Sequence, residues 1–208
     1  MEQTRIVVGG LGRCGSSLMM QMLSAAGVPC IGEFPSFEDG RLQFSNTALN
    51  VPLVQSHPGH AFKCLDWGSA WQMPEELRPF VLIWMTRRAR EQGESMVKFI
   101  QTVTQSRLPQ GTAGKMARRC IRDDRTSMEM MSKGCKALLR VHFGHVIEQP
   151  GQQSERIADW AGKTAGITLD AKVMVACVKP RSPRCARDMS IEMELLQEAA
   201  RRRMASVV

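Results

Sequence analysis

The sequence lacks several features that mark whole classes of protein. Its seven cysteines are scattered, odd in number and never spaced as CxxC, so they indicate neither a zinc site nor a disulfide framework. Reduced thiols in a cytoplasm are the simpler interpretation. No stretch of about 18 consecutive apolar residues is present, which argues against a membrane-spanning helix. A strand pattern begins at residue 5 and leaves no room for a signal peptide. We therefore expect a cytoplasmic protein that makes no use of a membrane.

Length and composition favour one folded domain over residues 1–208. Hydrophobic residues make up 43% and charged residues 23% of the 208 residues, which is ordinary for a soluble globular protein. The formal net charge of +8 favours an anionic partner. A nucleotide with several phosphates, a nucleic acid and an anionic membrane surface would all satisfy that charge.

The N-terminal stretch reads as a buried strand, a glycine-rich turn and an amphipathic helix. Residues 5–8 are mostly β-branched and apolar, residues 9–15 hold four glycines, and apolar residues recur at helical spacing over 18–26. Glycines let the backbone approach a ligand, and the free amides that begin a helix attract an anion. This stretch therefore predicts a phosphate cradle.

The order of residues in the turn limits which phosphate ligands it can be expected to bind. Gly10 and Gly15 have the glycine spacing of a P-loop, but Ser16 stands where its lysine belongs and the cation is Arg13. This pattern resembles the 5′-phosphosulfate loop of the sulfotransferases that use 3′-phosphoadenosine 5′-phosphosulfate (PAPS), usually P-[RK]-S-G-[ST]-[ST]-x-L. Glycine replaces the usual proline and cysteine the usual serine. The resemblance implies that PAPS is the co-substrate and that six residues bind its 5′ end: Gly12, Arg13, Cys14, Gly15, Ser16 and Ser17.

A second match follows the apolar run at 80–85, which has the length of a parallel strand covered on both faces. In the resembling family an arginine at a strand end and a serine eight residues later hold the 3′-phosphate. Arg87 and Ser95 have that spacing, and Arg88 is an alternative cation. An arginine fork supplies charge and paired hydrogen bonds to a dianion. The resemblance also extends to a C-terminal basic loop, where Lys179, Arg181 or Arg184 would add a cation.

The resemblance implies transfer of a sulfuryl group from PAPS to a hydroxyl or amine of a small acceptor, without a metal. Arg13 would neutralise charge on the leaving oxygen. Lys63 matches the lysine of the family's K-x-H segment, but Leu65 occupies the histidine position. The nearest alternative base is Glu33, because some members use a glutamate soon after the first helix. Three further candidates for the base stay open: Glu38, His60 and Asp66.

Strands that alternate with helices predict an α/β protein with a three-layer α/β/α arrangement around a parallel sheet. The resemblance makes this a P-loop NTPase-like sulfotransferase fold. We expect strands at 5–8, 28–31, 60–66, 80–85 and 137–142, and an irregular excursion at 32–59. We expect helices from about 16, at 89–104, at 115–136, at 154–161 with Ser154 as the cap, and at 190–203. Periodicity alone leaves 169–178 open between strand and helix, and the resemblance favours a helix.

Two other functions remain as alternatives. A P-loop nucleotide kinase or NTPase would turn over ATP with magnesium, although the lysine after Gly15 is missing. A non-catalytic nucleotide- or RNA-binding protein could use the same fold and the basic stretch from Arg118 to Arg125. Nucleic acid is not the partner we expect first.

Overall fold

A computed structural model describes residues 4–39, 41–45, 48–66 and 73–179. Its centre is a four-stranded parallel sheet in the order β4-β1-β5-β6. The strands are β1 (Arg5–Leu11), β4 (Phe62–Asp66), β5 (Phe80–Thr86) and β6 (Cys135–His142). All residues of β1 are buried, as its position between two parallel neighbours requires. The predicted parallel α/β architecture is confirmed.

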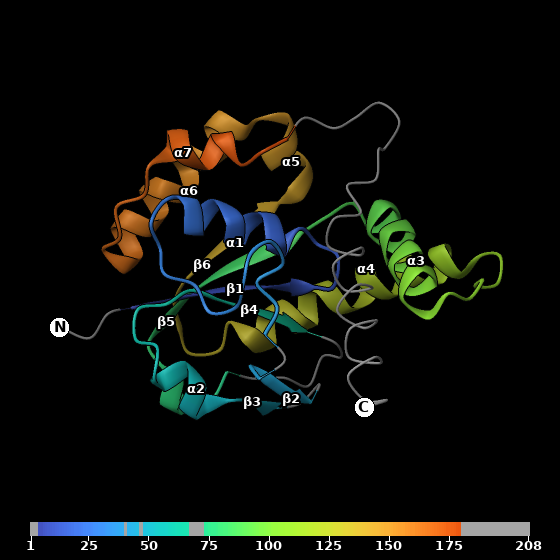
Figure 1. Cartoon of the computed structure of the whole chain (residues 1–208), viewed down its shortest axis with the longest axis horizontal. Helices are drawn as coiled ribbons and strands as arrows, with labels where there is room; N and C mark the ends of the chain where they lie inside the picture. The colour runs from blue at the N-terminus through green and yellow to red at the C-terminus, as the bar shows by residue number, and fades with distance from the viewer. Residues whose placement is uncertain (1–3, 40, 46–47, 67–72, 180–208) are drawn as a thin grey trace, which may run out of the picture.

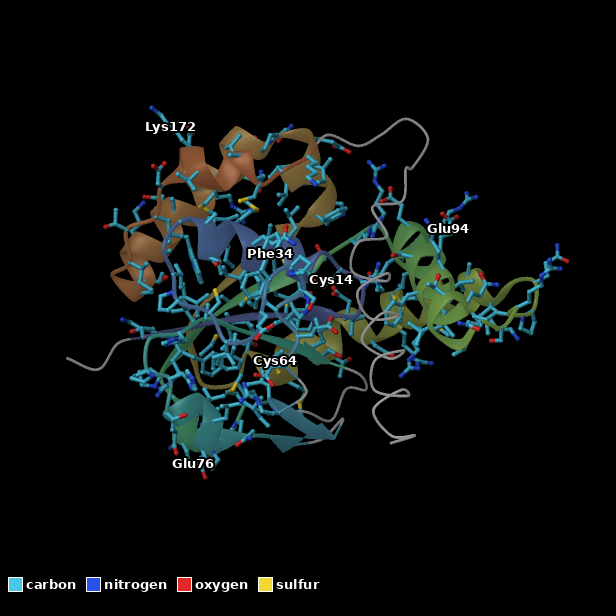
Figure 2. The ribbon with its side chains drawn as sticks, viewed as in Figure 1. Cys14, Phe34, Cys64, Glu76, Glu94 and Lys172 are labelled. Carbon is cyan, nitrogen blue, oxygen red and sulfur yellow. The ribbon has the colours of Figure 1, made fainter. Side chains whose placement is uncertain are left out.

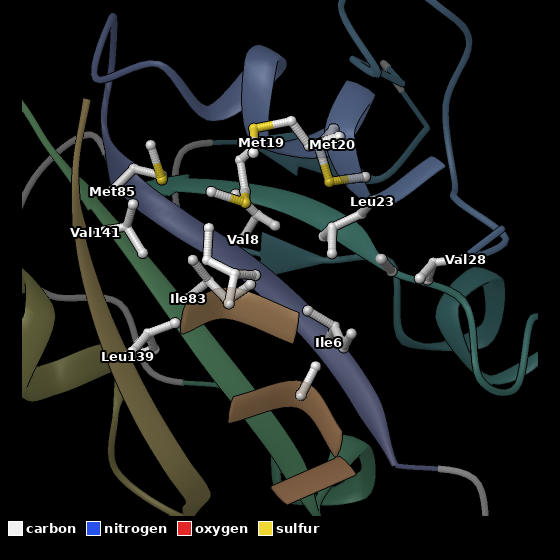
Figure 3. Packing of buried hydrophobic residues seen from close by; sticks show 14 of the residues in the cluster. Ile6, Val8, Met19, Met20, Leu23, Val28, Ile83, Met85, Leu139 and Val141 are labelled. Carbon is white, nitrogen blue, oxygen red and sulfur yellow. The ribbon is translucent and has the colours of Figure 1, made fainter. Parts of the chain in front are cut away.

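Side chains alternate between the two faces of the sheet, and helices cover both faces (Figure 1). One face carries α1 (Ser16–Ala25), α5 (Phe143–Glu148), α6 (Pro150–Ala165) and α7 (Ala171–Ala176). On this face Met19, Met20 and Leu23 of α1 pack against β-branched residues of the sheet (Figure 3). The flexible methionines fill the irregular space between a helix and a twisted sheet.

The opposite face carries a second buried cluster. It contains Phe62, Leu82 and Trp84 from the sheet and Met131 from the end of α4 (Thr112–Met131). The short helices α2 (Val51–Gln55) and η1 (Glu75–Leu77) complete this layer. The three-layer prediction is therefore confirmed. Exposed charged residues such as Glu94 and Lys172 project from the periphery, whereas Cys14 and Cys64 lie buried near the centre (Figure 2).

The helix α3 (Ala89–Thr104) packs closely against α4. A Cβ atom at Gly93 would overlap the carbonyl oxygen of Ala113 and lie 2.8 Å from the amide nitrogen of Ala117. Only glycine permits this approach of two helix backbones. The contact holds α3 against α4, and Gln92 of α3 reaches the turn that joins β1 to α1.

The predictions for two segments before β4 were wrong in detail. Residues 28–31 form no strand, because only Cys30 pairs, in a single bridge with Ala61. The expected excursion at 32–59 contains a two-stranded hairpin, β2 (Gln43–Ser45) and β3 (Ala48–Leu49), followed by α2. It also buries Leu42, Leu49 and Val54 in the second cluster, so its apolar side chains form part of the core.

Helix boundaries in the second half also differ from expectation. The helix predicted from Ser154 begins at Pro150, because proline fits the first turn of a helix, and Ser154 is fully buried inside it. The helix predicted at 115–136 runs from Thr112 to Met131. Within 169–178 the structure has the helix α7, capped by the side chain of Asp170. The predicted helix at 190–203 lies outside the described residues.

No helix within the described ranges combines the length and the apolarity that crossing a membrane requires.

Candidate functional site

The turn between β1 and α1 forms one wall of the site. Gly15 caps α1 with a φ of 101°, and a Cβ atom there would overlap the ring of Phe143. Glycine is thus required both by the backbone conformation and by the close ring. The first amides of α1 have no acceptor within the helix, which is the feature that attracts an anion to the start of a helix.

Cys14 lies beneath this turn. Its side chain is fully buried in the first cluster, and burial raises the pKa of its thiol to about 11. The thiol is therefore neutral near pH 7 and faces the core, so only the backbone of Cys14 can take part in binding an anion.

Arg13 stands at the tip of the turn with a φ of 66°, a conformation that few residues other than glycine adopt. Its Nε donates a hydrogen bond to Ser95 Oγ of α3 at 3.2 Å. Its guanidinium carbon lies 5.1 Å from the centre of the Phe99 ring, also on α3. These contacts direct the Arg13 side chain across the turn towards α3.

Arg87 follows β5 and approaches the same turn. Its Nη1 donates to the backbone oxygen of Arg13 at 3.4 Å, and its Nε lies 3.5 Å from Glu91 Oε2. The guanidinium carbon is 4.8 Å from the centre of the Phe143 ring at the start of α5. Two arginines that leave different strands are thus brought together, as expected for the carboxyl edge of a parallel sheet.

Lys63 lies on β4 behind the start of α1. It is buried, and its Nζ donates to Ser36 O at 2.7 Å, Glu38 Oε1 at 2.8 Å and Ser17 Oγ at 3.3 Å. Burial lowers the pKa of Lys63, and the charge of Glu38 opposes that shift. The lysine thereby ties the loop that carries Glu38 to the first turn of α1.

Gln92 of α3 holds the turn from below. Its side chain is 3% exposed, and Nε2 donates to the carbonyl oxygens of Leu11 at 3.2 Å and Gly12 at 2.8 Å. A buried amide with two acceptors satisfies carbonyl groups that would otherwise be desolvated without a partner.

A cavity of about 870 Å³ opens over the turn and the start of α1. Its polar wall is made by the turn, by both arginines and by Glu38. Lys179 lies at its edge beyond α7. The remaining wall is largely apolar and comes from one side of α1, the loop before Glu38, the end of β4, α3, α5 and the end of α7. Its larger apolar side chains are Phe34, Pro35, Leu65, Met96, Phe99, Ile100, Phe143 and Ile147.

The structure brings most of the predicted site residues to this cavity. Six of them line it: Gly12, Arg13, Gly15, Ser16, Ser17 and Arg87. Ser95 and Lys63 reach it through their hydrogen bonds to Arg13 and Ser17. Arg181 and Arg184 lie outside the described residues.

The candidates for the base are distributed differently from the prediction. Glu33 is exposed and is not part of the cavity wall, whereas Glu38 lines the cavity. Leu65 lines the cavity at the position where the resembling family has histidine. His60 packs against His57 with ring centres 5.1 Å apart and lies away from the wall. The backbone of Asp66 ends β4.

Sequence reasoning missed Gln92, Phe99 and Phe143. Gln92 and Phe99 lie three residues before and four after Ser95, and these helical spacings place all three on one face of α3. Phe143 directly follows β6, so the shared carboxyl edge of the sheet carries it towards the turn. Both signals are present in the sequence once the sheet order is known.

The basic stretch of α4 is largely paired within its own helix. Arg119 and Arg122 both lie close to Asp123, at 3.3 and 2.7 Å, and Arg125 lies 2.7 Å from Glu129. These arginines are exposed and their charge is offset locally. The pattern is that of a solvated helix face.

No protein-family model matches the sequence, and no curated protein does. Solved structures match the fold. The crystal structure of a retinol dehydratase in complex with androsterone and the inactive cofactor PAP matches with a TM-score of 0.57 and 11% identity, covering 85% of this chain and 64% of that one. Mouse sulfotransferase SULT7A1 complexed with PAP matches with a TM-score of 0.51 and 13% identity, covering 85% and 63%. The chain spans just under two thirds of each of these proteins, and its fold is sulfotransferase-like.

Proposed function

We propose that this chain is a sulfotransferase that moves a sulfuryl group from PAPS to a hydroxyl or amine of a small acceptor. The observation that carries the proposal is the convergence of Arg13 and Arg87 on one cavity at the start of α1. A doubly phosphorylated adenosine needs cations at two ends, and a helix start supplies the amides for one of them.

The residues of the wall suit the two ends of the nucleotide. The amides and hydroxyls of Ser16 and Ser17, with Arg13, would hold the 5′-phosphosulfate. Arg87 would hold the 3′-phosphate, and its position against Phe143 keeps the fork oriented. Ser95, bonded to Arg13, links the two ends. The resemblance assigns a further cation at the 3′ end to Arg181.

Catalysis would consist of positioning and of charge neutralisation. PAPS supplies the activated sulfuryl group: the acceptor oxygen or nitrogen bonds to sulfur while the bond from sulfur to the 5′-phosphate oxygen breaks. Arg13 stabilises the negative charge that stays on that oxygen. The acceptor proton passes to a carboxylate, and the cavity favours Glu38 over Glu33, because Lys63 holds Glu38 at the wall through a 2.8 Å ion pair.

The apolar part of the wall supports an acceptor with an apolar body. Phe99 and Ile100 of α3 face the cavity, and Phe34 stands in its wall with 74% of its surface exposed. An aromatic ring exposed beside a hollow gains most from contact with an apolar ligand. We therefore propose an alcohol, phenol or amine carried on a hydrocarbon or aromatic frame.

The free state of all six described cysteines supports the proposed cytoplasmic location. A non-catalytic nucleotide-binding role is the second candidate, because Leu65 stands at the histidine position and lines the cavity. That role predicts nucleotide binding without transfer. The kinase alternative has no support from the turn, because Ser16 replaces the lysine that reaches the outer phosphates of ATP.

Calorimetry with adenosine 3′,5′-bisphosphate (PAP) against ATP with magnesium tests the proposal. We expect the wild-type chain to bind PAP more tightly, and Arg13→Ala to weaken PAP at least tenfold, about 1.4 kcal/mol. A preference for magnesium ATP would overturn the assignment. A transfer assay with PAPS and an aromatic alcohol such as 2-naphthol separates an enzyme from a binding protein. An enzyme forms the sulfated alcohol and releases PAP, whereas a binding protein does neither.

A further inference from the structure

Three consecutive carbonyl groups of the turn accept hydrogen bonds from side chains in or just before α3. Gln92 Nε2 donates hydrogen bonds to Leu11 O and Gly12 O at 3.2 and 2.8 Å, and Arg87 Nη1 donates to Arg13 O at 3.4 Å. The partners lie 74 to 81 residues away along the chain. The orientation of this turn is thus fixed by a distant element rather than by local sequence.

The direction of these carbonyl groups determines where the amides of the turn point. A trans peptide unit is planar, so the C=O of one residue and the N–H of the next point in opposite directions. With the carbonyls of Leu11 and Gly12 held by Gln92, the N–H groups of Gly12 and Arg13 are turned away from Gln92. An anion bound over the turn requires amides on its own side and carbonyls on the other.

The packing of Gln92 favours this role over simple filling of space. The side chain is 3% exposed on the inner face of α3, where an apolar residue of similar length would fit the same volume. Such a residue would leave two buried carbonyl oxygens without these donors. The buried side-chain amide of Gln92 therefore acts to orient the turn.

We propose that Gln92 is a positioning residue that sets the amides of the turn for the 5′-phosphate. This inference rests on the proposed function, because the 5′-phosphate belongs to PAPS. Arg87 also donates to a carbonyl of the turn, that of Arg13, while its guanidinium group would bind the 3′-phosphate. Gln92 acts on the 5′ end alone, because its side chain donates to carbonyls of the turn and is not part of the cavity wall.

The pair PAP and adenosine 3′-monophosphate isolates the 5′ end, because the second lacks only the 5′-phosphate. The dissociation constant of adenosine 3′-monophosphate divided by that of PAP, both from calorimetry, measures what the turn contributes. We expect Gln92→Met to reduce the ratio about tenfold, in line with two lost hydrogen bonds of ordinary strength, with the affinity for adenosine 3′-monophosphate almost unchanged. A merely structural role would weaken both ligands together.

Gln153→Met provides a matched control. Gln153 is another buried glutamine, 6% exposed on α6, and its Oε1 accepts a hydrogen bond from Arg156. Its replacement removes a buried amide from the same fold at a distance from the turn. We expect the ratio of the two dissociation constants to match that of the wild type.

Gln92→Glu gives a second test, which can be used if Gln92→Met fails to fold. A carboxylate cannot donate to the two carbonyls, whereas a protonated carboxyl group donates once. Burial raises the pKa of such a group, so its protonated fraction grows as the solution is taken from about pH 8 to about pH 6. We expect the PAP affinity of Gln92→Glu to approach that of the wild type over this range, each measured at the same pH.

The outcomes separate the two proposals. A wild-type chain that fails to bind PAP rejects the proposed function and this inference with it. A wild-type chain that binds PAP, together with a Gln92→Met variant whose ratio is unchanged or a Gln92→Glu variant whose deficit does not depend on pH, overturns the role of Gln92 alone.

Discussion

Replacement of Arg87 by alanine should damage ligand binding far more than folding. Arg87 and Glu91 have side chains that are 22% and 23% exposed, and an ion pair of that kind contributes about 0.2–1 kcal/mol. The contact with the Phe143 ring adds about 0.5–1 kcal/mol. The free energy of unfolding should therefore fall by about 1–2 kcal/mol, which lowers Tm by roughly 2–8 °C for a chain of this length.

The expected loss in binding is larger and selective. Charged hydrogen bonds to a phosphate contribute about 1.5–3 kcal/mol, so Arg87→Ala should weaken PAP by about ten- to a hundredfold. Adenosine 5′-monophosphate lacks the 3′-phosphate, so its affinity should fall only through loss of the long 3.4 Å hydrogen bond from Arg87 to Arg13 O, by less than about threefold. Calorimetry with both nucleotides measures the difference directly.

Arg90→Ala, three residues beyond Arg87 in the first turn of α3, is the matched control. The Arg90 side chain is 91% exposed and pairs only with the exposed Glu94 among the contacts described, at 3.1 Å. Its removal should change neither PAP affinity nor stability by more than about 0.5 kcal/mol. Equal weakening of PAP and adenosine 5′-monophosphate in Arg87→Ala, or no weakening of either, would refute the assignment of Arg87 to the 3′-phosphate.

Three further predictions follow from the cavity and its burial. Glu38→Gln should lower the rate of sulfuryl transfer at least a hundredfold, about 2.7 kcal/mol, with PAP affinity unchanged, and Glu33→Gln should have little effect; the opposite ranking in a transfer assay would restore Glu33 as the base. Phe34→Ser should raise KM for 2-naphthol several-fold without lowering Tm, because the ring is already 74% exposed; an unchanged KM would exclude Phe34 from the acceptor site. Burial raises the pKa of Cys14 from 9.0 to about 11, so its contribution to stability is complete below pH 9 and is lost as the pH rises towards about 11. Urea unfolding of the wild type and of Cys14→Ala should therefore diverge less above pH 9, and rapid alkylation of Cys14 at pH 8 in the native state would contradict its burial.

Much of the site could be predicted from the sequence, because its first half is local. The strand, the glycine turn and the helix occupy one continuous stretch, and the turn's residues line the cavity as neighbours in the chain. Arg87 could be placed from a general rule, since the carboxyl ends of parallel strands share an edge. Neither step required knowledge of side-chain packing.

The choice between Glu33 and Glu38 could not be made in this way. The path of their loop is fixed by Gln21, whose Nε2 donates to Pro35 O at 2.8 Å, and by Lys63, which holds Ser36 O. Both anchors are distant in the sequence, and a shift of one residue in the loop would exchange a side chain in the cavity for one in solvent. Side-chain type alone carries no information on that register.

The hairpin and short helix within 32–59 were missed for a related reason. Their strands are only two and three residues long, so no periodicity develops. Leu42 and Val54 are buried because the second cluster offers them a surface, not because their neighbours form an amphipathic pattern. Tertiary contact overrides local preference there.

The sequence by itself determined the parallel α/β class, the glycine turn before α1 and the two arginines beyond β1 and β5, because each rests on local periodicity or on the shared edge of a parallel sheet. Only the tertiary structure decided that Gln92 holds the carbonyls of the turn and that Lys63 brings Glu38 to the cavity. Those contacts join segments that are 25 to 81 residues apart, and their geometry depends on how α3 and β4 pack beside the turn. Local patterns specify elements, whereas the orientation of an amide or a carboxylate within a site is set by the elements packed around it.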